Sequence, residues 1–153
     1  MKTKIVLGLA TILVALQFFR PEKYQGSPAF SGKNDATVVY PASAEVRQVL
    51  AAACYDCHSN RTTYPWYAEI QPVGWWLANH IKDARRELNF SEFGAYSAQR
   101  QMRKLENLCD EVRDRKMPLK SYTWLHARAR LTDAQITALC QWAEGAQDRI
   151  AEK

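Results

Sequence analysis

Apolar side chains recur at intervals of three and four residues in four separate stretches of the chain. This spacing places them on one side of an α-helix, whereas a half-buried strand would alternate apolar and polar residues. The sequence shows no convincing alternation of that kind and no internal repeat. We therefore predict an all-α fold with helices over residues 43–57, 73–90, 97–115 and 132–149.

Polar residues mark the beginnings of two of these helices. Ser43 can cap the first helix, and Thr132 with Gln135 forms a capping-box pattern at the last. The segments between the predicted helices, residues 59–72 and 116–131, contain prolines and lack periodicity. We predict irregular structure in both segments.

The N-terminus combines positive charge with an apolar run. Lys2 and Lys4 precede fifteen uncharged residues, from Ile5 to Phe19, which is typical of an export signal or a membrane anchor. No small-residue cleavage site follows, so we favour an uncleaved anchor, a transmembrane helix in the inner membrane. The positive-inside rule then places the remaining chain in the periplasm. The alternative is a soluble periplasmic protein released by signal cleavage.

The chain divides into three parts by composition. We assign residues 1–20 to the anchor or signal, 21–42 to a Pro- and Gly-containing linker, and 43–150 to one folded domain. The net charge is +5, and three of those charges belong to Lys2, Lys4 and Arg20. The rest is only mildly basic, which argues against a nucleic-acid partner.

One short motif carries the strongest chemical signal in the chain. Cys54-Tyr55-Asp56-Cys57-His58 has the C-x-x-C-H spacing of a covalently attached c-type haem. On a helix, positions i, i+3 and i+4 share one side, so both thiols and the imidazole can reach one macrocycle. We predict thioether bonds from Cys54 and Cys57 to one haem c, with His58 as an iron ligand.

A site without haem is the alternative interpretation of this motif. The same three side chains could bind zinc, but structural zinc sites close with four ligands and usually use a second paired cluster. The chain contains no second C-x-x-C and no H-x-x-x-H. A dithiol redox pair would need a βαβ context, which the helical pattern does not offer.

The sixth iron ligand decides whether such a haem carries electrons or binds small molecules. Met117 precedes Pro118 in an irregular segment, where its thioether can project from a loop, and it is our first candidate. His80 lies on the predicted buried face of its helix and is the alternative ligand. We expect His126 to be exposed to solvent.

Two further cysteines lie outside the motif. Cys109 and Cys140 each occupy an apolar position of a predicted helix. Outside the cytoplasm they could form a disulfide, and otherwise they would be two buried free thiols. The sequence leaves both alternatives open.

Several segments together resemble one known family. They are CYDCHSN, TTYPWY, VGWWLANHI, NFSEF, MPLKSYTWLH and LTDAQITALCQWA, and they are similar to the bacterial haem-binding domain family within the cytochrome c superfamily. The resemblance covers about residues 45 to 145. It implies a cytochrome c-like helical fold around one haem, thioethers at Cys54 and Cys57, and His58 and Met117 as iron ligands.

These observations favour a membrane-tethered periplasmic monohaem cytochrome that transfers single electrons between redox partner proteins of unknown identity. We expect an electron carrier and not an enzyme. Two alternatives are a haem-based sensor or peroxidase-like enzyme and a haem-free metal-binding module. We also expect His58 to donate its other ring hydrogen to a backbone carbonyl of the loop 65–72, and aromatic side chains to wall the haem, namely Tyr64, Trp66, Trp75 or Trp76.

Overall fold

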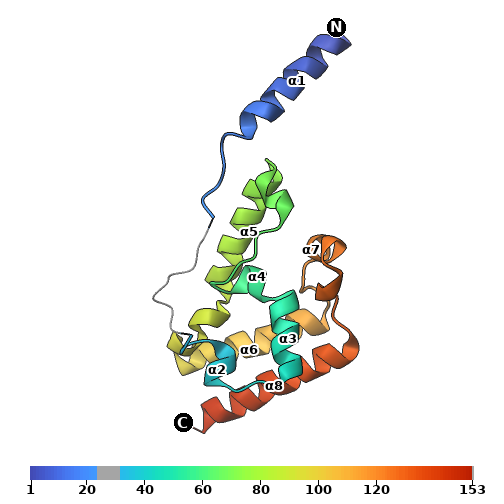
Figure 1. The fold of residues 1–153 in the computed structure, drawn as a ribbon. Coiled ribbons are helices and arrows are strands. Elements are labelled where there is room, and N and C mark those ends of the chain that lie inside the picture. Colours follow the sequence, from blue (N-terminus) through green and yellow to red (C-terminus); the bar gives the residue numbers. More distant parts are fainter. Residues whose placement is uncertain (24–31, 153) are drawn as a thin grey trace.

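The computed structural model describes residues 1–23 and 32–152, and within them every regular element is a helix (Figure 1). The prediction of an all-α fold is confirmed. The α-helices are α1 (Lys2–Leu16), α2 (Ala36–Val39), α3 (Ala44–Ala53), α4 (Tyr55–His58), α5 (Val73–Glu87), α6 (Ala98–Arg113), α7 (Lys120–Leu125) and α8 (Asp133–Ala151). Three short 3₁₀ segments join them: η1 (Trp66–Glu69), η2 (Phe90–Ala95) and η3 (Ala127–Ala129).

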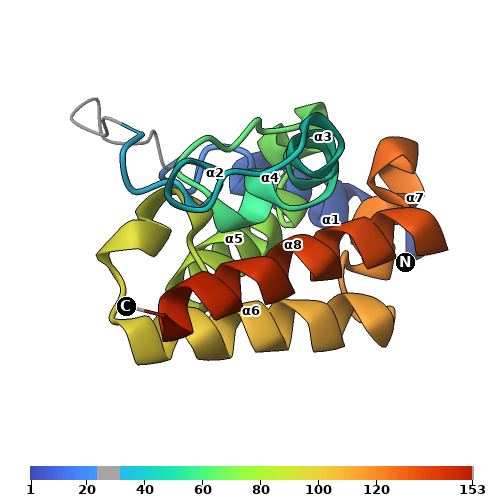
Figure 2. The ribbon, with the colours of Figure 1, turned by 90° about the horizontal axis from the view of Figure 1, so that it is seen from below.

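Helices α6 and α8 form the base of the domain. They run side by side in opposite directions, as Figure 2 shows. The apolar side chains of α6 that face the core are buried, namely Leu105, Leu108, Cys109 and Val112. Helix α3 also packs on α8. The largest fully buried apolar side chains of this core are Leu50, Phe90, Phe93, Leu105 and Leu139. Each contributes on the order of 2 kcal/mol through removal of its surface from water.

The first predicted helix is broken inside the cysteine motif. Ser43 caps α3 as expected, since its Oγ accepts a hydrogen bond from the backbone N–H of Val46 at 3.2 Å. At Cys54 the backbone leaves the helical region, with φ −125°, and the chain restarts as the single turn α4. The break reorients the turn that contains His58 relative to α3.

Two short helices occur where the sequence predicted none. Helix α2 lies inside the predicted linker, capped by Asp35, and Tyr40 just after it is buried in the core. Helix α7 lies inside the segment 116–131. Elements of four and six residues are too short to show helical periodicity, which explains both differences. The packed domain therefore begins before Ser43.

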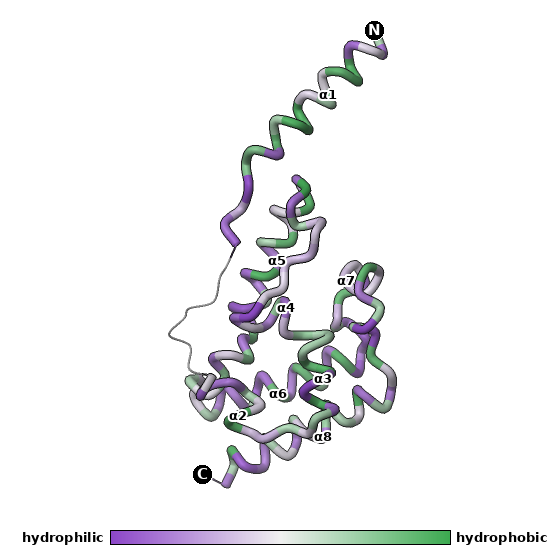
Figure 3. The backbone as a smooth tube through the Cα atoms, in the orientation of Figure 1, coloured by the Kyte–Doolittle hydropathy of each residue, from purple (hydrophilic) through white to green (hydrophobic). Residues whose placement is uncertain are grey.

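Helix α1 stands apart from the core, with no buried residue, and most of its residues are coloured as hydrophobic in Figure 3. Its end is fastened to the start of α5. The Gln17 side chain bonds to both backbone groups of Gln71, at 2.9 and 3.1 Å, and Trp75 Nε1 donates to the carbonyl of Phe19 at 2.6 Å. No helix among the described residues is long and apolar enough to cross a membrane. The predicted transmembrane helix is thus not supported by the structure.

A second, smaller apolar cluster joins η1 to α5. Ala68, Leu77 and Ile81 are buried together there. Gly74 makes the close approach possible, because a Cβ at this position would lie 2.4 Å from the carbonyl oxygen of Ala68. The cluster holds α5 in place above the base.

We expect Thr132→Ala to lower the free energy of unfolding by about 1 kcal/mol, because it removes the N-cap of α8. The capping box is fully formed: Thr132 Oγ1 accepts from the Gln135 N–H, and the Gln135 side chain accepts from the Thr132 N–H. Urea denaturation followed by circular dichroism measures the change. Thr137→Ala, an exposed position inside the same helix, is the matched control and should cost less. Equal losses in the two variants would contradict the capping argument.

Candidate functional site

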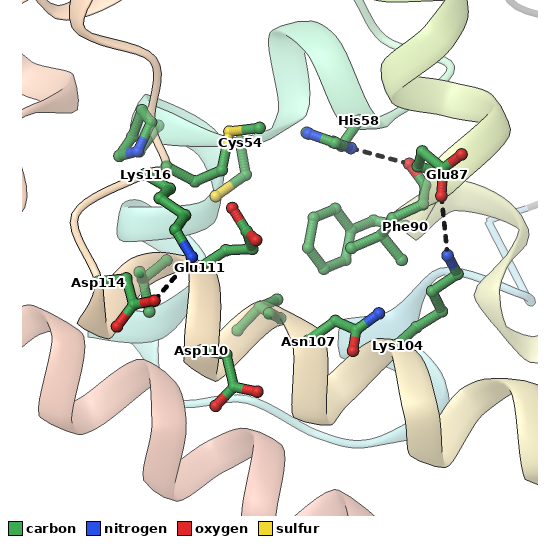
Figure 4. A pocket seen from close by; sticks show the side chains of 16 residues that line it. Cys54, His58, Glu87, Phe90, Lys104, Asn107, Asp110, Glu111, Asp114 and Lys116 are labelled. Carbon is green, nitrogen blue, oxygen red and sulfur yellow. Dashed lines mark hydrogen bonds and ion pairs between the residues drawn. The ribbon is translucent and has the colours of Figure 1, made fainter.

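A cavity of about 700 Å³ opens between α4, the end of α5, α6 and the segment that follows α6 (Figure 4). Its lining divides into two chemical groups. Apolar side chains contribute Ala53, Leu88, Phe90, Leu108, Val112 and Pro118, and charged or amide side chains contribute Glu87, Lys104, Asn107, Asp110, Glu111, Asp114 and Lys116. The remaining three lining residues are Cys54, His58 and Met117.

The orientation of His58 is fixed by one hydrogen bond. Its Nδ1 lies 3.0 Å from the carbonyl oxygen of Leu88, at the end of α5 (Figure 4). A carbonyl oxygen can only accept, so Nδ1 carries the hydrogen and Nε2 keeps its lone pair for a metal. The predicted bond to a backbone carbonyl is confirmed. The carbonyl belongs to Leu88 and not to the loop 65–72, so that part of the prediction is wrong.

The surroundings of His58 keep its ring neutral. Burial lowers the pKa of His58, and hydrogen bonding to the carbonyls of Leu88 and Ala84 opposes this only in part. Phe90 adds an apolar wall, with its ring centroid 6.4 Å away and nearly perpendicular to the imidazole. The neutral imidazole is the form that binds a metal ion.

A buried polar network fastens the residues that follow His58 to those that follow Leu88. Asn89 Nδ2 donates to Asn60 Oδ1 at 2.8 Å, and the Asn60 N–H donates to Ser91 Oγ at 3.1 Å. All three side chains are buried, so losing one partner would leave unsatisfied polar groups. The network therefore positions both ends of the bond between His58 and Leu88. Sequence reasoning missed it, because single polar residues in a loop show no pattern that reveals burial.

The two cysteines of the motif occupy different surroundings. Cys54 lines the cavity, whereas Cys57 packs against the small cluster of Ala68, Leu77 and Ile81. Burial raises the pKa of Cys54 to about 12 and that of Cys57 to about 11. Both groups are thus neutral thiols at pH 7. Thioether formation at the two cysteines stays a prediction.

A chain reversal after α6 brings Met117 to the cavity. Arg115 adopts a left-handed conformation with φ 56°, which ends α6. The backbone N–H groups of Lys116 and Met117 then both donate to the carbonyl of Glu111, at 2.9 and 3.0 Å. The structure therefore places Met117 and His58, 59 positions apart in the sequence, on the lining of one cavity.

The other two histidines lie outside this lining. His80 Nδ1 bonds to the Trp76 carbonyl at 2.9 Å, and the rings of these residues are 4.1 Å apart. His126 stacks on Tyr122 at 4.0 Å and is half-buried, so its expected exposure is only partial. Of the sixth-ligand candidates, only Met117 lines the cavity with His58.

The aromatic residues that we predicted beside the haem are not those that line the cavity. Tyr64, Trp66, Trp75 and Trp76 do not line the cavity. The aromatic ring that does so is Phe90, at the start of η2. The sequence carries several aromatic residues close to the motif, and proximity along the chain does not determine which of them face the same side.

Cys109 and Cys140 face each other between α6 and α8 as buried free thiols. Burial is the main cause that raises the pKa of Cys109, and a hydrogen bond with Cys140 raises it further. Of the two alternatives left open by the sequence, this arrangement matches the free thiols. Neither residue contributes to the cavity.

Comparison with known proteins agrees with the chemistry of the cavity. The family model of the haem-binding domain matches residues 11–145, which is most of the chain. The chain belongs to the haem-binding domain family. Neither the curated proteins nor the solved structures contain a match to this haem-binding domain.

The residues of the cavity suit a haem. The haem-binding domain supplies a neutral imidazole from His58, a thioether from Met117 and an apolar inner wall. Lys104 and Lys116 also line the cavity, where they pair with the carboxylates of Glu87 and Asp114. Among the residues described, no group of three or more His, Cys, Asp or Glu side chains is arranged to hold a bare metal ion. The haem-free alternative gains no support from this geometry.

We expect Asn60→Ala to lower the free energy of unfolding by about 1–3 kcal/mol, because it leaves Asn89 without its buried acceptor. Chemical denaturation of the haem-loaded chain measures the loss. Asn79→Ala replaces an exposed asparagine on α5 and should change stability by less than about 0.5 kcal/mol. A loss at Asn60 no larger than that at Asn79 would show that the network does not stabilise the fold.

Proposed function

We propose that this protein is a membrane-tethered c-type cytochrome in the periplasm that carries one covalently attached haem and transfers single electrons between partner proteins. The observation that carries the proposal is the shared cavity of His58, Met117 and Cys54. The hydrogen bond to Leu88 leaves the Nε2 lone pair of His58 available to the iron, and the Met117 thioether would be the second iron ligand.

A haem in this cavity would supply reversible one-electron chemistry. The residues of the chain would bind this haem and orient its ligands. The Leu88 carbonyl holds the imidazole plane, and Phe90, Leu108 and Val112 keep water from the inner cavity. Apolar walls and thioether ligation both favour the less charged reduced state. Because His58 and Met117 would both hold the iron and leave no free position for a substrate, we propose a carrier and not an enzyme.

Tethering and location rest on the N-terminal pattern. Helix α1 begins at Lys2, carries no charge after Lys4, and is exposed from its start to Ala15. An exposed apolar helix needs a covering, and a lipid phase provides one. Lys2 and Lys4, at the start of this helix, favour a cytoplasmic N-terminus, with the cysteine motif on the periplasmic side.

We expect the native chain, made in cells that mature c-type haem, to be heavier than its polypeptide by the mass of one haem. Cys54 and Cys57 each offer one neutral thiol for attachment. Mass spectrometry of the intact denatured protein measures the added mass. Cys54→Ala together with Cys57→Ala should abolish it.

The matched control is Cys109→Ala, which removes a buried thiol of the α6 and α8 interface and should keep the added mass. A chain that binds haem yet releases all of it on denaturation would contradict covalent attachment. Such a result would still leave the haem-binding family assignment in place.

We expect Met117→Ala to change the ferric absorption spectrum and to lower the reduction potential by something on the order of 100 mV, because axial ligands set haem potentials over a range of about 0.8 V. Spectroscopy and redox titration of the loaded protein measure both effects. Met102→Ala is the control, since Met102 is a half-buried methionine of α6 outside the cavity lining.

Carbon monoxide binding separates the carrier from a sensor. With Met117 in place the reduced protein should bind carbon monoxide slowly, and Met117→Ala should make binding fast. An unchanged spectrum in Met117→Ala, together with a changed one in His80→Ala, would transfer the ligand role to His80.

A further inference from the structure

The exposed apolar side chains of the folded domain gather at one end. Beyond Phe19, the described chain exposes eight large apolar side chains. Val38 is one of them, and the other seven lie in residues 66–76 and 119–125. They are Trp66, Ile70, Val73, Trp76, Leu119, Trp124 and Leu125. We call these seven residues the apolar tip.

The two segments of the apolar tip are neighbours in space. The ring of Tyr67 in η1 lies 6.0 Å from that of His126, which follows α7. Figure 1 shows the start of α5 and helix α7 on the side of the domain from which α1 extends. An isolated exposed apolar residue is ordinary, but a group gathered on adjoining segments marks an interaction surface.

The apolar helix α1 ends at the same place. Beyond its bonds to Gln71 and Trp75, the chain is held by Arg20, whose guanidinium pairs with Glu69 at 2.8 Å. Lys23 pairs with the same carboxylate. The end of the uncharged run therefore contacts η1 and the start of α5, and whatever covers the apolar helix also reaches the apolar tip.

We propose that the apolar tip lies in the headgroup region of a phospholipid bilayer, at the level where α1 leaves the lipid. Tryptophan is enriched at this depth in membrane proteins, because its ring is apolar and its N–H is polar. The proposal rests on the membrane tether proposed above. It adds a defined orientation of the domain to that tether.

This orientation fixes the height of the haem cavity. Helix α5 runs from the apolar tip at Val73 to the cavity at Glu87, and its 15 residues span about 22 Å. The cavity would be held above the bilayer surface, within reach of a partner protein that approaches from the aqueous side.

Hydroxyl-radical footprinting of the full chain in vesicles of phosphatidylcholine and phosphatidylglycerol tests the proposal, with oxidation at each tryptophan read by mass spectrometry. Trp66 and Trp124 are 73% and 77% exposed, whereas Trp142 is 8% exposed and serves as the slow reference. In water the two tip tryptophans should react about tenfold faster than Trp142, following exposed area. In the bilayer headgroups we expect that ratio to fall at least about threefold.

Flotation of the vesicles distinguishes failure of the membrane tether from failure of the membrane role of the apolar tip. A chain that does not float with the vesicles lacks the tether, and both the tether and the membrane role of the apolar tip are then contradicted. A chain that floats while Trp66 and Trp124 keep the full tenfold ratio retains the tether but overturns the membrane role of the apolar tip, and would assign this surface to a protein partner.

A matched pair of variants tests whether the tip acts as a unit. Trp124→Glu places a charge at α7 and should restore at least about threefold faster oxidation of Trp66 in vesicles, because burying the charge in lipid is costly. Val38→Glu changes the exposed apolar residue that lies outside the tip and should leave Trp66 protected. Equal protection of Trp66 in both variants would contradict the proposal.

Discussion

The hydrogen bond between His58 Nδ1 and the Leu88 carbonyl is the constraint on which the site depends. It joins a single helical turn, α4, to the end of α5, and it determines which ring nitrogen faces the cavity. A four-residue helix has too few internal hydrogen bonds to fix a side chain by itself. The buried contacts of Asn60 and Asn89 supply the rigidity that α4 lacks.

The rest of the fold supports the two sides of this cavity separately. The pair α6 and α8 forms a rigid base, and α6 ends in the reversal at Arg115 that returns Met117 to the cavity. Helix α5 rests on the small cluster around Leu77, and its end presents the Leu88 carbonyl. The two candidate ligands thus come from opposite parts of the domain, and packing of the core sets the space between them.

Much of this architecture could be predicted from the sequence, because the buried face of a long helix requires apolar residues at intervals of three and four. The spans of α5, α6 and α8, the Ser43 cap and the capping box at Thr132 all follow from local patterns. The cysteine motif and the proline after Met117 pointed to three cavity residues, Cys54, His58 and Met117. Short elements, the Leu88 carbonyl and Phe90 could not be found in this way, since they depend on contacts between segments far apart in the chain.

X-ray absorption at the iron edge of the haem-loaded protein tests the central claim most directly. The account predicts six ligands at the iron: four porphyrin nitrogens, one imidazole nitrogen from His58 and one sulfur from Met117. Six nitrogen or oxygen neighbours without sulfur, or a five-coordinate iron, would contradict the proposed ligation by His58 and Met117.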